Sequence, residues 1–144
     1  MWYNAIMVWL LRSPLHGMLS QSTMLMTYTG RKSGKAYSTP MNYVRIREAG
    51  AEVLLTTSYR QRTWWRNLRG GAPVVVRVQG KDLKSQAEAI EDEPKVAEEL
   101  GRFLQHVPSW AKYYQVKLDP DGKPNAADVA VAAKTRVIIR THRA

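Results

Sequence analysis

Cysteine is absent from the sequence, and histidine occurs only three times in 144 residues. Without cysteine the chain can form neither a disulfide nor a thiolate metal site. The histidines, His16, His106 and His142, are far apart in the sequence, and none belongs to an H-x-x-x-H pair. We therefore expect no metal centre.

Acidic residues are missing from long parts of the first half of the chain, and the net charge is +10. The first acid is Glu48, and none stands between Glu52 and Asp82. Seven acids then gather within Asp82–Glu99. This asymmetry indicates an anionic partner for the first half of the chain, and nucleic acid, anionic lipid and an acidic cofactor are all compatible with it.

Several motifs of well-known enzyme classes are also missing. There is no G-x-G-x-x-G and no regular alternation of strands and helices, which disfavours a parallel dinucleotide-binding sheet. There is no G-x-S-x-G nucleophile elbow, and the basic half has no pair of carboxylates for acid–base catalysis. A chain with few catalytic acids and many aromatic residues fits a reaction that is carried by a bound cofactor.

The N-terminal residues are apolar but match neither a signal peptide nor a membrane span. They lack a basic n-region and a small-residue cleavage site. The apolar run ends at Arg12, well short of the roughly 20 residues that a spanning helix needs. We expect a helical segment over residues 1–19 within a single domain of residues 1–144, either covering the core or contacting a membrane surface or a second subunit. The expected location is cytoplasmic, with membrane association as an alternative.

Short apolar runs with strand periodicity, separated by glycine-containing turns, dominate the rest of the chain. Helical patterns cover Pro94–His106 and, in shorter form, Thr63–Arg69 and Val107–Tyr114. The sequence therefore predicts an α+β, mainly β, protein with an antiparallel barrel or sheet and flanking helices. Six strands are expected: Thr23–Thr29, Tyr37–Arg47, Val53–Thr57, Val74–Val78, Leu83–Ala89 and Thr135–Thr141.

The stretch TYTGRKSGKAYSTP carries three cations within the loop Gly30–Lys35. It differs from a P-loop because only three residues separate its glycines and because Ala36 stands where a Mg²⁺-binding hydroxyl belongs. The residues that follow favour a strand and not a helix, so the loop is expected to connect a hairpin. It is either a solvated basic turn or a site for phosphate or carboxylate groups.

Two aromatic clusters are the other candidate functional elements. Trp64 and Trp65 point about 100° apart on a helix, so that one can lie in the core while the other faces a cleft and a flat ring system. Trp110 shares a helix face with Tyr113 and Tyr114. These three residues either cover the barrel or line a substrate pocket, where a phenol could donate a hydrogen bond or a proton.

Two blocks of the sequence, TGRKSGKAYSTPMNYV and then WWRNLRGGAPVVVRV, resemble the deazaflavin-dependent nitroreductase family of split-β-barrel oxidoreductases. The resemblance covers Met24–Val78 and continues more faintly at VPSWAKYY. It rests on a G-R-K-S-G loop followed, in this order and at this distance, by a W-x-x-N-L-R segment.

The resemblance implies a split antiparallel β-barrel that binds coenzyme F-420, a deazaflavin with a phosphate and an acidic oligoglutamate tail. The reduced cofactor gives a hydride to a small, electron-poor acceptor such as a quinone, an enone or a nitro compound. In this family the phosphate and tail lie on the loop, here Arg31, Lys32, Ser33, Gly34 and Lys35. The ring system lies beside Pro40, Met41, Thr57, Ser58, Trp64, Trp65 and Asn67. The candidate catalytic residues, on the acceptor side, are Asn42, Trp110, Tyr113 and Tyr114.

Other interpretations stay open at this point. FMN is the alternative cofactor, because relatives of this fold divide between flavin, deazaflavin and haem. Asn42 stands where nitro-reducing members often have tyrosine, so the acceptor is not fixed. A homodimer is a further expectation by analogy. From a different class, a basic nucleic-acid-binding barrel without redox activity is the alternative, although we expect no nucleic acid.

Overall fold

The computed structural model describes residues 23–143. The helical segment expected over residues 1–19 lies outside the described residues. Within the described part, no helix combines the length and the apolar character needed to cross a bilayer. The elements are, in chain order, β1 (Thr23–Thr29), β2 (Ala36–Asn42), β3 (Val44–Glu48), β4 (Ala51–Tyr59), the 3-10 helix η1 (Trp64–Leu68), β5 (Ala72–Val78), β6 (Lys81–Ile90), α3 (Glu93–His106), the 3-10 helix η2 (Pro108–Tyr114), α4 (Ala126–Ala133) and β7 (Arg136–Arg143).

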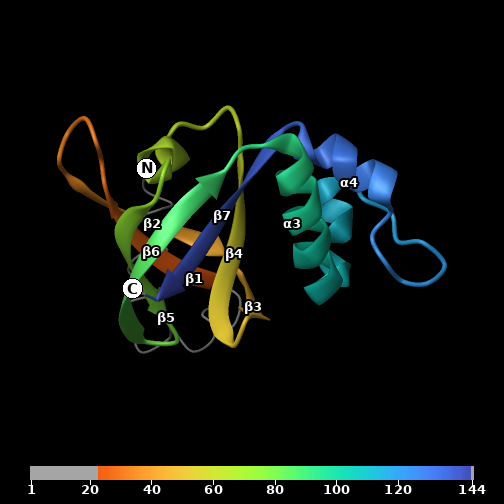
Figure 1. Ribbon diagram of the computed structural model, residues 1–144, viewed down its shortest axis with the longest axis horizontal. Coiled ribbons are helices and arrows are strands. Elements are labelled where there is room, and N and C mark those ends of the chain that lie inside the picture. Colours follow the sequence, from red (N-terminus) through yellow and green to blue (C-terminus); the bar gives the residue numbers. More distant parts are fainter. Residues whose placement is uncertain (1–22, 144) are drawn as a thin grey trace.

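The seven strands form one antiparallel sheet in the order β2-β1-β5-β6-β7-β4-β3. The two edge strands, β2 and β3, are consecutive in the chain and are separated by Tyr43 alone. The sheet must therefore curl until its edges approach each other, which produces an incompletely closed barrel with α3 and α4 on one side (Figure 1). Across the remaining gap, the Thr56 hydroxyl donates a hydrogen bond to the Asn42 carbonyl.

The expected mainly β barrel is confirmed, and two details of the prediction are wrong. The segment Tyr37–Arg47 is not one strand but two, because β2 pairs with β1 while β3 pairs with β4. The chain crosses the split at Tyr43, whose side chain is buried in the barrel interior. The strand predicted over Val53–Thr57 is longer, Ala51–Tyr59, because the turn before it is confined to Ala49 and Gly50, whose φ angles of 50° and 81° suit a two-residue hairpin.

Successive side chains of a strand point to opposite faces of the sheet, so the apolar residues of the strands are divided between two cores. In β4, Leu54 faces the barrel interior, whereas Val53 and Leu55 face the helices. In β7, Ile139 faces the interior and Ile138 faces the helices. The interior core also holds η1 in place, and the outer core holds α3, η2 and α4.

A network of ion pairs attaches α3 to the sheet. Arg102 of α3 and Arg140 of β7 both donate to the Glu48 carboxylate at the end of β3, Arg102 at 2.7 Å. Both arginines also reach Glu99, at 3.3 and 3.0 Å. Hydrogen bonds from Arg140 and then Arg102 lower the pKa of Glu48 from 4.5 to about 2.

Candidate functional site

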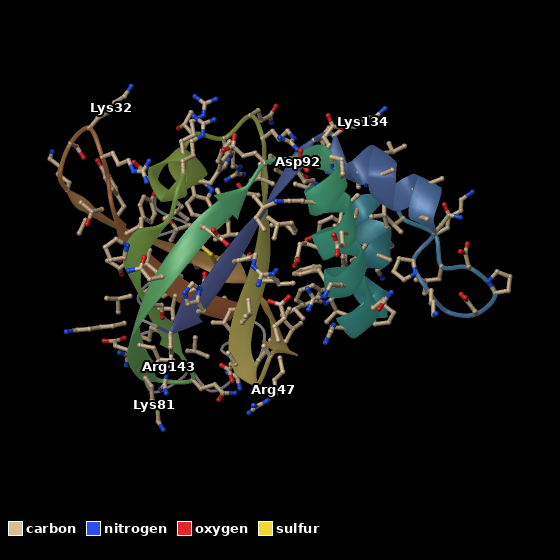
Figure 2. The ribbon with its side chains drawn as sticks, viewed as in Figure 1. Lys32, Arg47, Lys81, Asp92, Lys134 and Arg143 are labelled. Carbon is tan, nitrogen blue, oxygen red and sulfur yellow. The ribbon has the colours of Figure 1, made fainter. Side chains whose placement is uncertain are left out.

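The basic loop Gly30–Lys35 projects from the sheet as the connection between β1 and β2, with Lys32 at its tip (Figure 2). Its backbone closes on itself, because the Gly30 N–H donates to the Lys35 carbonyl and the Gly34 N–H donates to the Gly30 carbonyl, both at 2.8 Å. Gly34 has a φ of 70°, a left-handed conformation in which glycine is favoured. The loop is therefore an ordered turn that presents its cations to solvent.

Asn67 of η1 fixes this loop in position. The Arg31 N–H donates to the Asn67 Oδ1 at 2.9 Å, and the Asn67 Nδ2 donates to the Trp64 carbonyl at 2.8 Å. The Arg31 guanidinium also donates to the Arg69 carbonyl. Asn67, expected beside the cofactor ring, thus connects the basic loop to η1.

The two tryptophans of η1 have different surroundings. Trp65 is 2% exposed within the interior core, and its Nε1 donates to the Tyr59 carbonyl at 3.0 Å. Trp64 is half-buried, its Nε1 donates to Ser58 Oγ at 3.0 Å, and its ring centroid lies 5.6 Å from that of Tyr28. This difference agrees with the sequence analysis, in which adjacent helical residues point in directions about 100° apart and one tryptophan can be buried while the other faces a cleft. The more specific expectation that Trp65 packs beside a cofactor ring is corrected, because burial makes it a core residue.

Three neighbouring hollows follow the surface from the basic loop toward η2. The loop hollow, of about 680 Å³, is lined among others by Arg31, Lys32, Ser33 and Trp64. The middle hollow, of about 250 Å³, is lined among others by Pro40, Met41, Ser58 and Trp64. The tyrosine hollow, of about 550 Å³, is lined by Asn42, Thr57, Tyr59, Trp110, Tyr113, Tyr114 and Arg136.

Shared walls join these hollows into one groove. Trp64 lines both the loop hollow and the middle hollow. Asn42, Thr57 and Tyr114 line both the middle hollow and the tyrosine hollow. None of the described residues that line the three hollows is acidic. The loop end of the groove therefore carries several cations, and the other end combines phenols with the cation of Arg136.

The tyrosine hollow brings together the four residues expected on the acceptor side. The Tyr114 hydroxyl and the Thr57 hydroxyl are hydrogen-bonded at 2.8 Å. Burial raises the pKa of Tyr114 above 10.0, against smaller lowering effects of the Thr57 hydrogen bond and the Arg136 charge. The phenol therefore stays protonated near neutral pH. Tyr113 is 65% exposed at the rim, and the Trp110 ring packs 5.7 Å from Phe103.

Sequence reasoning missed Arg136 at the start of β7. Its guanidinium carbon lies 4.5 Å from the centroid of the Tyr59 ring and 4.3 Å from that of Tyr114. The residue is only 8% exposed, and it lines the middle and tyrosine hollows. No sequence signal could have found it, because an arginine at a strand end is ordinarily a solvated residue.

The expected cofactor-binding residues are otherwise distributed along the groove. Arg31, Lys32 and Ser33 line the loop hollow, and Pro40, Met41, Thr57 and Ser58 line the middle hollow. Gly34 and Lys35 form the exposed far side of the loop, where the Lys35 N–H donates to Ser33 Oγ at 3.2 Å. Tyr28 and Tyr37, stacked at 5.8 Å, add an aromatic wall to the loop hollow that was not expected.

The curled sheet and its basic, aromatic groove define a split-barrel protein of the flavin and deazaflavin oxidoreductase class. A family model described as F420H(2)-dependent quinone reductase matches residues 12–121, so the chain belongs to that family. It is a deazaflavin-dependent oxidoreductase, and its cofactor is coenzyme F-420. The resemblance found in the loop and helix motifs is thereby confirmed.

Two solved structures share the fold at low sequence identity. A domain-swapped dimer is 20% identical with a TM-score of 0.51, and the match covers 96% of each chain. The FAD and heme binding protein from Mycobacterium smegmatis is 13% identical with a TM-score of 0.52, over 92% of this chain and 67% of that one. An F420-H2 dependent reductase is 21% identical with a TM-score of 0.47, over 85% of this chain and 96% of that one. No curated protein matches the chain.

The described groove fits this cofactor chemically. Phosphate and carboxylate groups need cations without competing acids, and the loop hollow offers Arg31 and Lys32 with no acidic residue among its described walls. A Cβ on Gly30 would lie 2.7 Å from Ser33 Oγ and 2.8 Å from Tyr37 Cε2, so a larger residue here would displace the Ser33 and Tyr37 side chains from this hollow. The middle hollow offers the Trp64 ring, Pro40 and Met41 to a flat ring system, among hydroxyl, amide and guanidinium side chains that can hydrogen-bond to its polar edge.

Proposed function

We propose that the groove orders the two reactants of an F-420-dependent reduction along its length. The phosphate and tail of the cofactor bind at the loop hollow, its ring lies at the middle hollow, and the acceptor occupies the tyrosine hollow. One observation carries this proposal: the three hollows share walls, the cationic loop lines the first of them, and the phenols of Tyr113 and Tyr114 line the last.

The loop contributes binding more than chemistry. Arg31 and Lys32 attract the anionic groups, and Ser33 adds a hydroxyl. Because Asn67 already fixes the loop against η1, little conformational entropy is lost when the tail binds.

The middle hollow orients the ring. Trp64, held by its hydrogen bond to Ser58, supplies a flat apolar face, and Pro40 and Met41 line the same hollow. When bound, coenzyme F-420 supplies the hydride. The protein's contribution is to hold the ring and the acceptor in contact and to keep water out.

The tyrosine hollow suits a small, flat and electron-poor acceptor. Trp110 and Tyr113 offer ring faces, and Asn42 and the protonated Tyr114 offer polar groups for a carbonyl oxygen. Quinones are the acceptor that we propose first, with enones and nitro compounds as further candidates of the same electronic type.

Binding of coenzyme F-420 and FMN at two salt concentrations tests the loop. The variant Lys32→Ala/Lys35→Ala loses two exposed charges, each worth about 0.5–1 kcal/mol, so we expect F-420 affinity to fall roughly five- to thirtyfold with little change in Tm. Lys81→Ala/Lys84→Ala is the matched control, because it removes the same charge from β6; Figure 2 shows Lys81 at the opposite end of the sheet from Lys32.

Equal F-420 affinity in the loop variant and the control would remove the loop from the site. A preference for FMN over F-420 would favour the flavin alternative at the same groove. Binding to nucleic acid that competes with F-420 and falls steeply with salt would favour the basic-barrel alternative.

The assembly state is a separate proposal. We propose that residues 1–144 form one domain and that the chain associates as a homodimer, as a protein of the same fold does in its domain-swapped form. Light scattering of the purified chain distinguishes monomer from dimer. Liposome partitioning with and without residues 1–11 tests whether the N-terminal segment contacts membrane, and cell fractionation tests the cytoplasmic location.

A further inference from the structure

Arg136 is a buried cation in the wall that the middle and tyrosine hollows share. Its guanidinium is held between the Tyr59 and Tyr114 rings at 4.5 and 4.3 Å. Two ring faces restrain the plane of the guanidinium by cation–π contact and leave its N–H edge for another partner. The side chain is therefore preorganised at the place proposed for the acceptor.

The charge of Arg136 has no carboxylate partner within residues 23–143. The Arg136 side chain makes one hydrogen bond to the described residues, a long one from a terminal guanidinium nitrogen to the Tyr59 hydroxyl at 3.5 Å. The buried Nε of Arg136 has no partner among them. Burying an unpaired cation is costly. Arg102 and Arg140, which are also partly buried, do pair with carboxylates.

We propose that Arg136 is the anion-binding residue of the tyrosine hollow and binds the acceptor oxygen that becomes negative during reduction. A quinone that accepts a hydride gains two electrons and one proton and becomes a hydroquinone monoanion, while the cofactor is oxidised by the same two electrons. A proton from water then completes the hydroquinone. The inference rests on the proposed placement of the acceptor.

The surroundings of Arg136 make such an interaction strong. The cation lies in a partly desolvated wall, where a charge acts over a lower effective dielectric than at the surface. It is fixed before the reaction, so that no reorganisation is needed as the oxygen becomes negative. Arg136 thus favours the reduced acceptor over the oxidised one.

Equilibrium binding of two ligands of nearly the same shape tests this assignment without turnover. The ligands are 1-naphthoate, an anion, and 1-naphthamide, its neutral counterpart, titrated by calorimetry into protein loaded with oxidised F-420. We expect the wild type to prefer the anion by roughly tenfold or more, as hydrogen bonds to a charged group imply. Arg136→Met should abolish the preference, and Arg136→Lys should retain part of it.

Arg62→Met is the matched control, because Arg62 also lines the middle hollow but is exposed. It should keep the wild-type preference for the anion. An equal loss in the Arg62 and Arg136 variants would assign the preference to the general positive field and overturn the proposal. An unchanged preference in Arg136→Met would overturn it as well.

F-420 affinity, measured by cofactor fluorescence in each variant, separates this inference from the proposed function. Wild-type F-420 affinity with a lost anion preference in Arg136→Met supports the inference. A large loss of F-420 affinity in the same variant, with the preference intact, would place Arg136 on the cofactor and overturn it. Failure of the loop variants to affect F-420 binding would instead contradict the groove assignment itself.

Discussion

Removing the Asn67 side chain should test most directly whether the basic loop is preorganised for its ligand. The variant Asn67→Ala deletes the hydrogen bond from the Arg31 N–H at 2.9 Å and the bond to the Trp64 carbonyl at 2.8 Å. Each is worth about 0.5–1.5 kcal/mol. Since Arg31 is exposed, water replaces part of its bond. We expect a total loss of about 1–2 kcal/mol.

Most of this loss should appear in cofactor binding. The free loop of the variant is less ordered, so binding must supply the ordering that Asn67 supplies in the wild type. About 1.4 kcal/mol corresponds to a tenfold change in affinity. We therefore expect the Kd for F-420 to rise roughly tenfold in a fluorescence titration at fixed salt, while the loop keeps all its charges.

Asn125→Ala is the matched control for this variant. Asn125 also makes two side-chain hydrogen bonds, accepting from the Asp128 N–H at 3.0 Å and donating to Asp119 at 2.9 Å. It precedes α4, on the opposite side of the molecule from the β1–β2 loop (Figure 1). Losing this helix cap should cost about 1 kcal/mol of stability and leave F-420 affinity unchanged.

Two results would refute this reasoning. If Asn67→Ala binds F-420 within twofold of the wild type, the loop is ordered by other contacts. If both variants lose affinity equally, the effect follows from stability and not from loop position. Urea denaturation of both variants supplies the stability comparison.

Three further predictions concern stability, loop space and the acceptor. Glu48→Gln should lower the free energy of unfolding at pH 7 by about 1–2 kcal/mol after allowance for a carboxylate that is one-third exposed. Because the folded pKa of about 2 lies below the ordinary 4.5, this stabilisation is present above about pH 5 and is lost as the pH falls toward 2. Urea denaturation across this pH range measures it, and a difference in unfolding free energy between wild type and variant that is constant with pH would contradict it. Gly30→Ala places a Cβ 2.8 Å from the Tyr37 ring, so we expect F-420 to bind several-fold more weakly in a fluorescence titration, with a small change in Tm. An unchanged F-420 affinity would show that the loop accommodates the methyl group. Tyr114→Phe keeps the ring but removes the hydroxyl that is hydrogen-bonded to Thr57 at 2.8 Å. In steady-state kinetics we expect the quinone KM to rise roughly threefold to tenfold while F-420 affinity is unchanged. A wild-type KM would exclude the hydroxyl from the acceptor site.

The barrel could be predicted from the sequence because its strands carry local signals. Thr23–Thr29 is observed with the predicted bounds, and the helix predicted from Pro94 to His106 differs by one residue at its start. The division of Tyr37–Arg47 could not be predicted, since it depends on which neighbours β2 and β3 find in the closed sheet. Pairing partners are a property of the whole fold and not of a local pattern.

The site was predictable to the extent that its residues are close in the sequence. The basic loop and Trp64 stand within motifs, and they line adjoining hollows. Arg136 comes from the last strand, and it meets Tyr59 and Tyr114 because β7 pairs with β4 and η2 lies beside them. A single cation near the end of the chain has no pattern that distinguishes it from a solvated residue.

The short helix η1 makes the site depend on the core. Trp65 anchors η1 in the barrel interior, and the next residues of the same helix, through Asn67, hold the basic loop. Trp64, which is not buried in that core, lines both the loop hollow and the middle hollow. A change at Trp65 must therefore move the cofactor groove as well as the core, so loss of F-420 binding there would report a displaced helix and not a lost contact. Function at the loop is best measured in variants that leave Trp65 in place.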